Sequence, residues 1–119
     1  MLNWDRLRAC GIDTGAGMAC CAEDGEFYAE MLGEFVRDAA AKLGELERFC
    51  AARDWDNYRI RAHSLKSTSR TIGATALSQR AKALEDAAKA GDADAVLAAH
   101  GAFLADLGAL VGAVRAALD

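Results

Sequence analysis

Two histidines are the side chains in this sequence best suited to chemistry, and one of them stands among cations. His63 is followed by Lys66 and is flanked by Arg59 and Arg70. On a helical wheel with about 100° per residue, these three cations fall within about 60° of His63. Apolar or small residues gather on the opposite side of the wheel: Tyr58, Ala62, Leu65, Ser69 and Ile72. His63 is therefore predicted to face away from the core, in a row with the cations.

This arrangement suits a carrier of phosphoryl groups. Such a carrier needs a nucleophile that is uncharged near neutral pH, and imidazole, with an unperturbed pKa of about 6.5, meets this need. Neighbouring cations favour the neutral ring, attract an incoming phosphoryl group and offset its charge after attachment. An exposed ring is also accessible to donor and acceptor proteins. The alternative is an ordinary histidine on a solvated helix face.

The motifs of an autonomous kinase are missing from the sequence. It contains no G-x-x-x-x-G-K-[ST] segment, no glycine-rich nucleotide loop and no carboxylate cluster suited to magnesium. We therefore expect a protein that is not an enzyme, binds no ATP and receives its phosphoryl group from a partner.

The composition predicts an all-α fold. Hydrophobic residues make up 53% of the 119 residues, aromatic residues only 7%, and proline is absent, a combination typical of helices. Apolar periodicity predicts long helices at about 25–52, 55–72, 74–90 and from 93 onward, preceded by one or two short helices within 1–22. We expect a single domain, 1–119, that forms an antiparallel four-helix bundle with a short accessory N-terminal helix.

Gly33 and Gly44 lie inside the first long helix, where each costs about 1 kcal/mol relative to alanine. We expect packing to override this cost, for example through the close approach of a neighbouring element.

The net charge and the hydropathy of the sequence limit the kinds of partner that we expect for this protein. The net charge of −4 argues against nucleic acid. The N-terminus does not resemble a secretory signal, and the apolar stretch Leu107–Val114 is too short to cross a bilayer. We expect a cytoplasmic protein without direct membrane contact, whose four cysteines are reduced thiols: Cys10, Cys20, Cys21 and Cys50.

The segment 62–74, AHSLKSTSRTIGA, resembles the signature of histidine-containing phosphotransfer (HPt) domains, which reads roughly A-H-x-L-K-G-x-[SA]-x-x-[IL]-G-A. Leu77 and the pair Leu84-Glu85 also fall where that family has a leucine and an L-E pair. Upstream, residues 11–13 and 24–36 are similar to the family's first and second helices, so the resemblance covers nearly the whole chain.

The resemblance implies a monomeric bundle in which His63 carries phosphate on its outer ring nitrogen and Lys66 lies beside the phosphoryl group. It implies response-regulator receiver domains as partners and hybrid histidine kinases as donors. The receiver would supply an aspartate and a magnesium ion, so the chain itself would need no cofactor and no metal.

Three further residues on this face are candidate contacts for the partner. Ser67 replaces the family's usual glycine; its hydroxyl could donate to the phosphoryl group or bond back to a helix carbonyl. Arg59 and Arg70 could guide an acidic receiver face, or they are ordinary solvated charges.

Other polar residues are interpreted as structural. His100 is expected to be partly buried on the last helix. Four residues of the helix at 74–90 are expected to be solvated charges: Arg80, Lys82, Glu85 and Asp86.

Two other functions compete with the phosphocarrier. One is a helical interaction module that has kept the fold without being phosphorylated, although the presence of His63 and Lys66 favours the carrier. The other is the phosphoacceptor domain of a kinase, whose H-E-[LI]-[RK]-[TN]-P motif needs a proline that this chain lacks.

Overall fold

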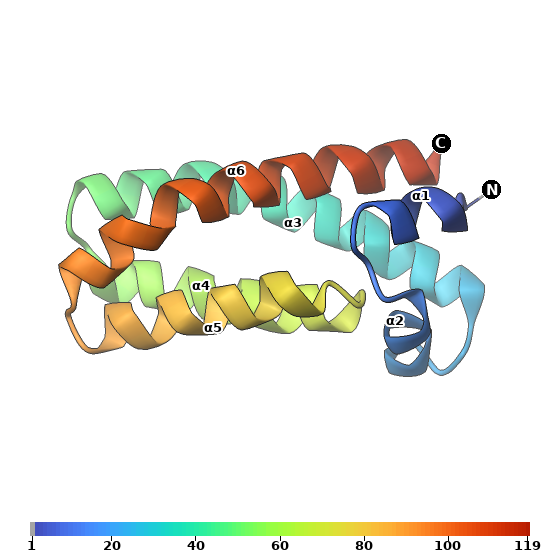
Figure 1. Cartoon of the computed structure of the whole chain (residues 1–119), viewed down its shortest axis with the longest axis horizontal. Helices are drawn as coiled ribbons and strands as arrows, with labels where there is room; N and C mark the ends of the chain where they lie inside the picture. The colour runs from blue at the N-terminus through green and yellow to red at the C-terminus, as the bar shows by residue number, and fades with distance from the viewer. Residues whose placement is uncertain (1) are drawn as a thin grey trace.

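The computed structural model describes residues 2–119, and this part of the chain forms six helices joined by short turns (Figure 1). The helices are α1 (Trp4–Ala9), α2 (Thr14–Cys20), α3 (Gly25–Ala51), α4 (Trp55–Thr71), α5 (Thr75–Lys89) and α6 (Ala93–Leu118). The predicted all-α fold is confirmed, and the four long helices begin and end within one residue or so of the predicted bounds. Two short helices, α1 and α2, precede the bundle, within the one or two expected.

Side-chain caps explain where most helices begin. Residues of the Asp or Asn type accept a hydrogen bond from a backbone N–H of the first turn at five starts: Asn3, Asp13, Asp24, Asp54 and Asp92. Such a cap satisfies one of the amide donors that a helix leaves free, and it stabilises the helix by about 1 kcal/mol. Helix α5 follows Ala74 and has no side-chain cap.

The four long helices form two layers. Helices α3 and α6 lie together in one layer, and α4 and α5 lie together in the other (Figure 1). Each long helix packs against its two neighbours in the order α3, α4, α5, α6 and back to α3. The short connections make sequential helices antiparallel, as expected for a bundle of this kind.

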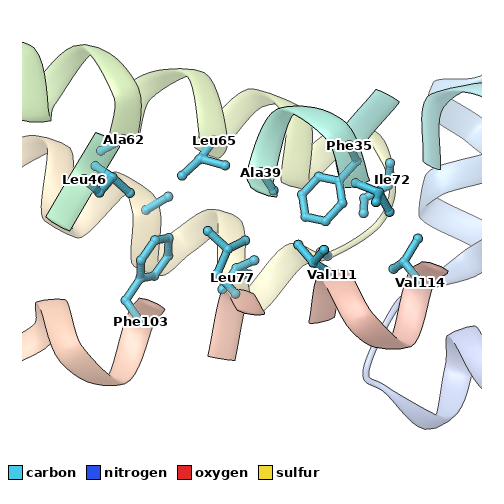
Figure 2. Packing of buried hydrophobic residues seen from close by; sticks show 14 of the residues in the cluster. Phe35, Ala39, Leu46, Ala62, Leu65, Ile72, Leu77, Phe103, Val111 and Val114 are labelled. Atoms are coloured by element: carbon cyan, nitrogen blue, oxygen red, sulfur yellow. The ribbon is translucent and has the colours of Figure 1, made fainter. Parts of the chain in front are cut away.

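The core lies between these layers. All five residues placed on the inner side of α4 by the wheel are buried. They meet apolar side chains from the other layer, among them Leu46, Phe35, Phe103 and Val111 (Figure 2). Each large side chain buried in this way contributes roughly 1.5–3 kcal/mol, so core packing fixes which face of α4 remains outside.

Two glycines allow α2 to lie against the end of α4. Gly73 has φ +87°, and its carbonyl accepts a hydrogen bond of 2.9 Å from the Asp13 amide. A Cβ on Gly73 would lie 2.0 Å from the Asp13 carbonyl oxygen, and one on Gly17 would lie 2.7 Å from the Ile72 carbonyl oxygen. Only residues without a side chain fit at these two positions.

The close approach expected at Gly33 and Gly44 is not found. A Cβ on Gly44 would meet nothing within 4 Å, and one on Gly33 would meet only the flexible Arg37 side chain at 3.6 Å. The expectation was wrong because no atom of another element lies within 4 Å of a Cβ at either position.

Only the stretch Leu107–Val114 was considered as a possible membrane span from the sequence, but the apolar character extends over the whole of helix α6. By length and composition alone, this helix of 26 residues could cross a membrane. A core helix of a globular protein passes the same test, and Val96, Phe103 and Leu107 of α6 are buried in the bundle. All four cysteines are free thiols.

Candidate functional site

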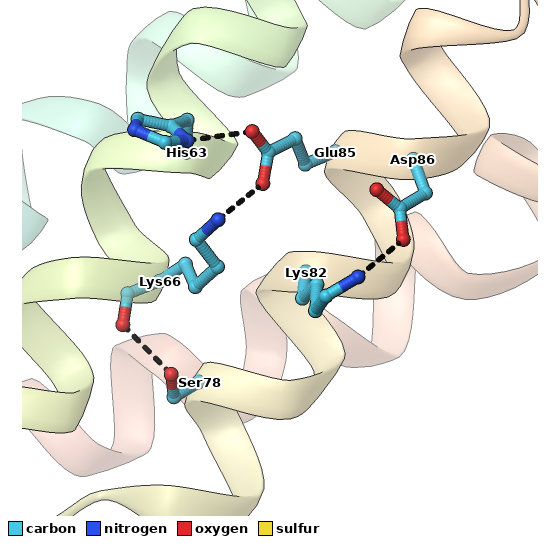
Figure 3. A network of polar contacts seen from close by, with 6 residues as sticks. All are labelled: His63, Lys66, Ser78, Lys82, Glu85 and Asp86. Atoms are coloured by element: carbon cyan, nitrogen blue, oxygen red, sulfur yellow. Dashed lines mark hydrogen bonds and ion pairs between the residues drawn. The ribbon is translucent and has the colours of Figure 1, made fainter.

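His63 lies on the outer face of α4, as the wheel predicted. Its side chain is 59% exposed. Its Nδ1 atom lies 2.6 Å from Oε2 of Glu85, which projects from the neighbouring helix α5 (Figure 3). The second ring nitrogen lies on the side of the ring away from Glu85. The outer nitrogen is therefore the one available to another molecule.

Glu85 joins His63 to Lys66. Its Oε1 atom lies 2.9 Å from the Lys66 Nζ atom, so one carboxylate holds both side chains (Figure 3). Burial of Glu85 raises the pKa of its carboxyl group, but the hydrogen bonds and charges of Lys66 and His63 outweigh burial and lower the pKa below its usual value. Glu85 is therefore ionised at neutral pH.

The ionised carboxylate of Glu85 determines that Nδ1 of the His63 ring carries a proton. A carboxylate can only accept hydrogen bonds, so Nδ1 of His63 must carry a proton. In a neutral ring, the lone pair then resides on Nε2, the exposed nitrogen. In that neutral form, the lone pair therefore faces solvent on the side of the ring away from Glu85.

The prediction that Glu85 is a solvated charge is wrong. Its side chain is only 16% exposed, because it lies against α4 between its two partners. Its neighbour Asp86 instead pairs with Lys82 at 2.9 Å on the exposed side of α5, as predicted for both. Arg80, also expected to be solvated, is partly buried, and it pairs with Asp106 of α6 at 2.6 Å.

Ser78 fixes α5 against the segment that carries the site. Its buried hydroxyl donates a hydrogen bond of 2.7 Å to the backbone carbonyl of Lys66 (Figure 3). Such a bond between helices constrains how far α5 can slide along α4. Ser78 was not singled out from the sequence, where its only signal is its place beside Leu77 at the start of a helix.

The remaining candidates surround His63 without joining its hydrogen bonds. Ser67 and Arg70 are exposed, and Arg59 is partly buried. Within residues 2–119, neither arginine forms an ion pair, and the Ser67 hydroxyl makes no bond to a helix carbonyl. The bond back to a helix carbonyl that was considered for Ser67 is made instead by Thr71, whose hydroxyl donates to the Ser67 carbonyl at 3.0 Å.

His100 has the structural role expected of it. It is partly buried on α6, and its Nδ1 atom lies 2.8 Å from the hydroxyl of the buried Tyr58. Burial lowers the pKa of His100, while the nearby charge of Glu47 opposes the shift. No cluster of three or more potential metal ligands occurs in the part of the chain that the structure describes.

Comparison with known protein families gives one match. The family model of the Hpt domain matches residues 30–118, which include α4, α5, α6 and most of α3. The chain belongs to the Hpt domain family. Hpt domains act in phosphotransfer within two-component phosphorelays, where they interact with receiver domains and kinases. The similarity expected upstream of residue 30 lies outside this match.

Comparisons with curated proteins and with solved structures gave no match. The family assignment therefore rests on the match of the family model alone.

Proposed function

We propose that this protein is a phosphohistidine carrier that uses Nε2 of His63. It accepts a phosphoryl group from the aspartyl phosphate of one receiver domain, in a hybrid histidine kinase, and donates it to the aspartate of a second, in a response regulator. The observation that carries this proposal is the 2.6 Å contact between Nδ1 of His63 and Glu85, because it holds a proton on Nδ1 and leaves the lone pair of the neutral ring on the exposed Nε2.

The transfer step balances without any further reactant. The Nε2 lone pair forms the N–P bond while the P–O bond to the receiver's aspartate breaks, and that carboxylate takes the electron pair. The Nδ1 proton stays in its hydrogen bond, so the phosphorylated ring bears a positive charge beside the Glu85 carboxylate. Opposite charges at this distance stabilise each other. Donation to the second receiver reverses these changes.

Lys66 supplies positive charge for the phosphoryl group. It lies three residues from His63, on a neighbouring position of the same helix face. Its Nζ atom is held beside the ring by Glu85. A cation held near the transferring group stabilises its charge without reorganisation during the reaction.

The surrounding face would bind the receiver. Arg59 and Arg70 flank His63 and would meet acidic groups of the partner. Ser67 would donate its hydroxyl to the phosphoryl group. In this proposal the carrier works in the cytoplasm, without nucleic acid, without direct membrane contact and without kinase activity. It needs no cofactor of its own, because the magnesium ion is bound by the receiver.

A receiver domain carrying a radioactive phosphoryl group tests the proposal. The wild-type protein is expected to acquire a label that is labile in acid and stable in alkali, as expected of a phosphohistidine. The variant His63→Gln is expected to acquire none. Label retained on this variant, or absent from the wild type while receiver binding persists, would contradict the proposal; the second outcome would indicate an interaction module.

A further inference from the structure

Helix α6 presents an unusually apolar face to the outside of the bundle. Only 28% of its most apolar 18-residue window is buried. The side chain of Leu97 is among the exposed large hydrophobic groups of the molecule, at 45%. Residues on the outward side of the wheel are Asp94, Leu97, Ala98, Gly101, Ala105, Gly108, Gly112 and Arg115. Charge therefore occurs on this side only near its two ends.

A groove between α6 and α3 continues this face. It is lined by Leu43, Gly44, Glu47, His100, Gly101, Leu104 and Ala105. A Cβ on Gly44 or on Gly101 would meet nothing within 4 Å, so the groove is open to solvent at both glycines. Glu47, the one acidic residue lining it, is exposed and can remain hydrated at its edge.

The charges at the two ends of α6 indicate what could cover this face. Asp94 and Arg115 are both exposed, and neither forms an ion pair within residues 2–119. In an antiparallel pair of α6 helices, Asp94 of each copy can face Arg115 of the other. The face is thus complementary in charge to itself, which is the property of a two-fold symmetric interface. We propose that it binds a second copy of this chain.

The antiparallel arrangement that pairs Asp94 with Arg115 also brings surfaces of complementary shape together. A two-fold axis that pairs Asp94 with Arg115 passes between Leu104 and Ala105, which both line the groove. It places Leu97 of one copy opposite Gly112 of the other, where a Cβ would meet nothing within 4 Å. A large side chain therefore faces an open position on each side of the axis. Charge and packing thus select the same arrangement.

This interface leaves the phosphotransfer site free. Helix α6 packs its backbone against α1, α3 and α5. It meets α4 through His100 and Tyr58, and Tyr58 is buried on the side of α4 opposite His63. The α3–α6 layer lies on the opposite side of the bundle from the α4–α5 layer (Figure 1). Both histidines of a dimer would therefore remain accessible to receivers. The proposed dimer does not depend on phosphotransfer, and it replaces the expectation of a monomer.

Sedimentation equilibrium of the whole chain tests the proposal. The face consists of one helix and a groove, so we expect a weak interface at the low end of size for specific contacts. The mass of the wild-type protein should rise from 12.6 kDa towards twice that value between low micromolar and millimolar concentration. Ala105→Arg places a long cation near the axis and should abolish the rise. Ala83→Arg, on an exposed position of α5, is the matched control and should not change it.

Charge reversal tests the antiparallel register. D94R and R115D should each weaken self-association about fivefold or more, since each turns two attractive pairs into repulsive ones. An equimolar mixture of the two variants should associate again, because attraction then occurs only between unlike chains. Circular dichroism checks that each variant keeps its helix content.

Three results would overturn the proposal. The first is a constant monomer mass at all concentrations, whether or not the protein binds lipid vesicles through α6. The second is association of Ala105→Arg as strong as that of the wild type. The third is a mixture of D94R and R115D that stays as weakly associated as either variant alone.

Discussion

Glu85 lies 2.6 Å from Nδ1 of His63 and belongs to a different helix. The contact links the outer faces of α4 and α5, and the same carboxylate holds Lys66. The reactivity proposed for His63 therefore depends on how two helices pack, in addition to the residues around the histidine in sequence.

Replacement of Glu85 by alanine should slow phosphotransfer. A hydrogen bond to a charged group contributes about 1.5–3 kcal/mol, so its loss should lower the transfer rate by about tenfold or more. Glu85→Gln keeps an oxygen acceptor for the Nδ1 proton and should be less impaired. Rates measured with a phosphorylated receiver check both variants. Asp86→Ala, at the exposed neighbouring position, is the control, and an equal loss there would contradict the role of Glu85.

Lys66→Ala should slow phosphotransfer and leave the fold intact. The substitution removes the cation beside the phosphoryl group, whereas the backbone contact with Ser78 involves only the Lys66 carbonyl and survives. Circular dichroism should therefore show unchanged helix content, while the rate falls by about tenfold. If the helix content collapsed, Lys66 would have a structural role instead.

Gly73→Ala should destabilise the protein much more than Gly91→Ala. Both glycines have positive φ, +87° and +68°, so alanine is strained at either position by about 1–2 kcal/mol. Only at Gly73 would the new Cβ also collide with the Asp13 carbonyl, at 2.0 Å. Urea unfolding of the two variants measures the difference. Similar losses of unfolding free energy in the two variants would mean that α2 can move away from Gly73 at little cost.

Stability should fall in mild acid because of His100. Its folded-state pKa is lowered by burial, so the folded protein binds this proton less readily than the unfolded chain does. The contribution of neutral His100 to the stability of the fold is thus complete above the pKa of histidine in the unfolded chain, about 6.5. It is lost as the pH falls through the lower pKa of His100 in the folded protein. Urea unfolding between pH 8 and pH 5, roughly spanning this window, should show a smaller decline for His100→Gln than for the wild type. Equal declines would assign the effect to other groups.

Much of the fold and part of the site could be predicted from the sequence. The helices follow from apolar periodicity and from caps such as Asp24 and Asp54, which are local features. The outward direction of His63 follows from the wheel, because the apolar residues of α4 leave only one face for the core. The resemblance in the segment 62–74 indicated the family that the family model then showed.

The sequence by itself determined the helices, the family and the exposed position of His63, because short-range patterns encode these features. Only the tertiary structure showed that Glu85 is a partner of His63 and not a solvated charge, since 22 residues separate the two and their contact depends on the packing of α4 against α5. The same holds for the glycines: Gly17 and Gly73 allow close packing, whereas Gly33 and Gly44 do not. A glycine's role depends on what lies beside it in space, and local sequence does not specify that neighbour.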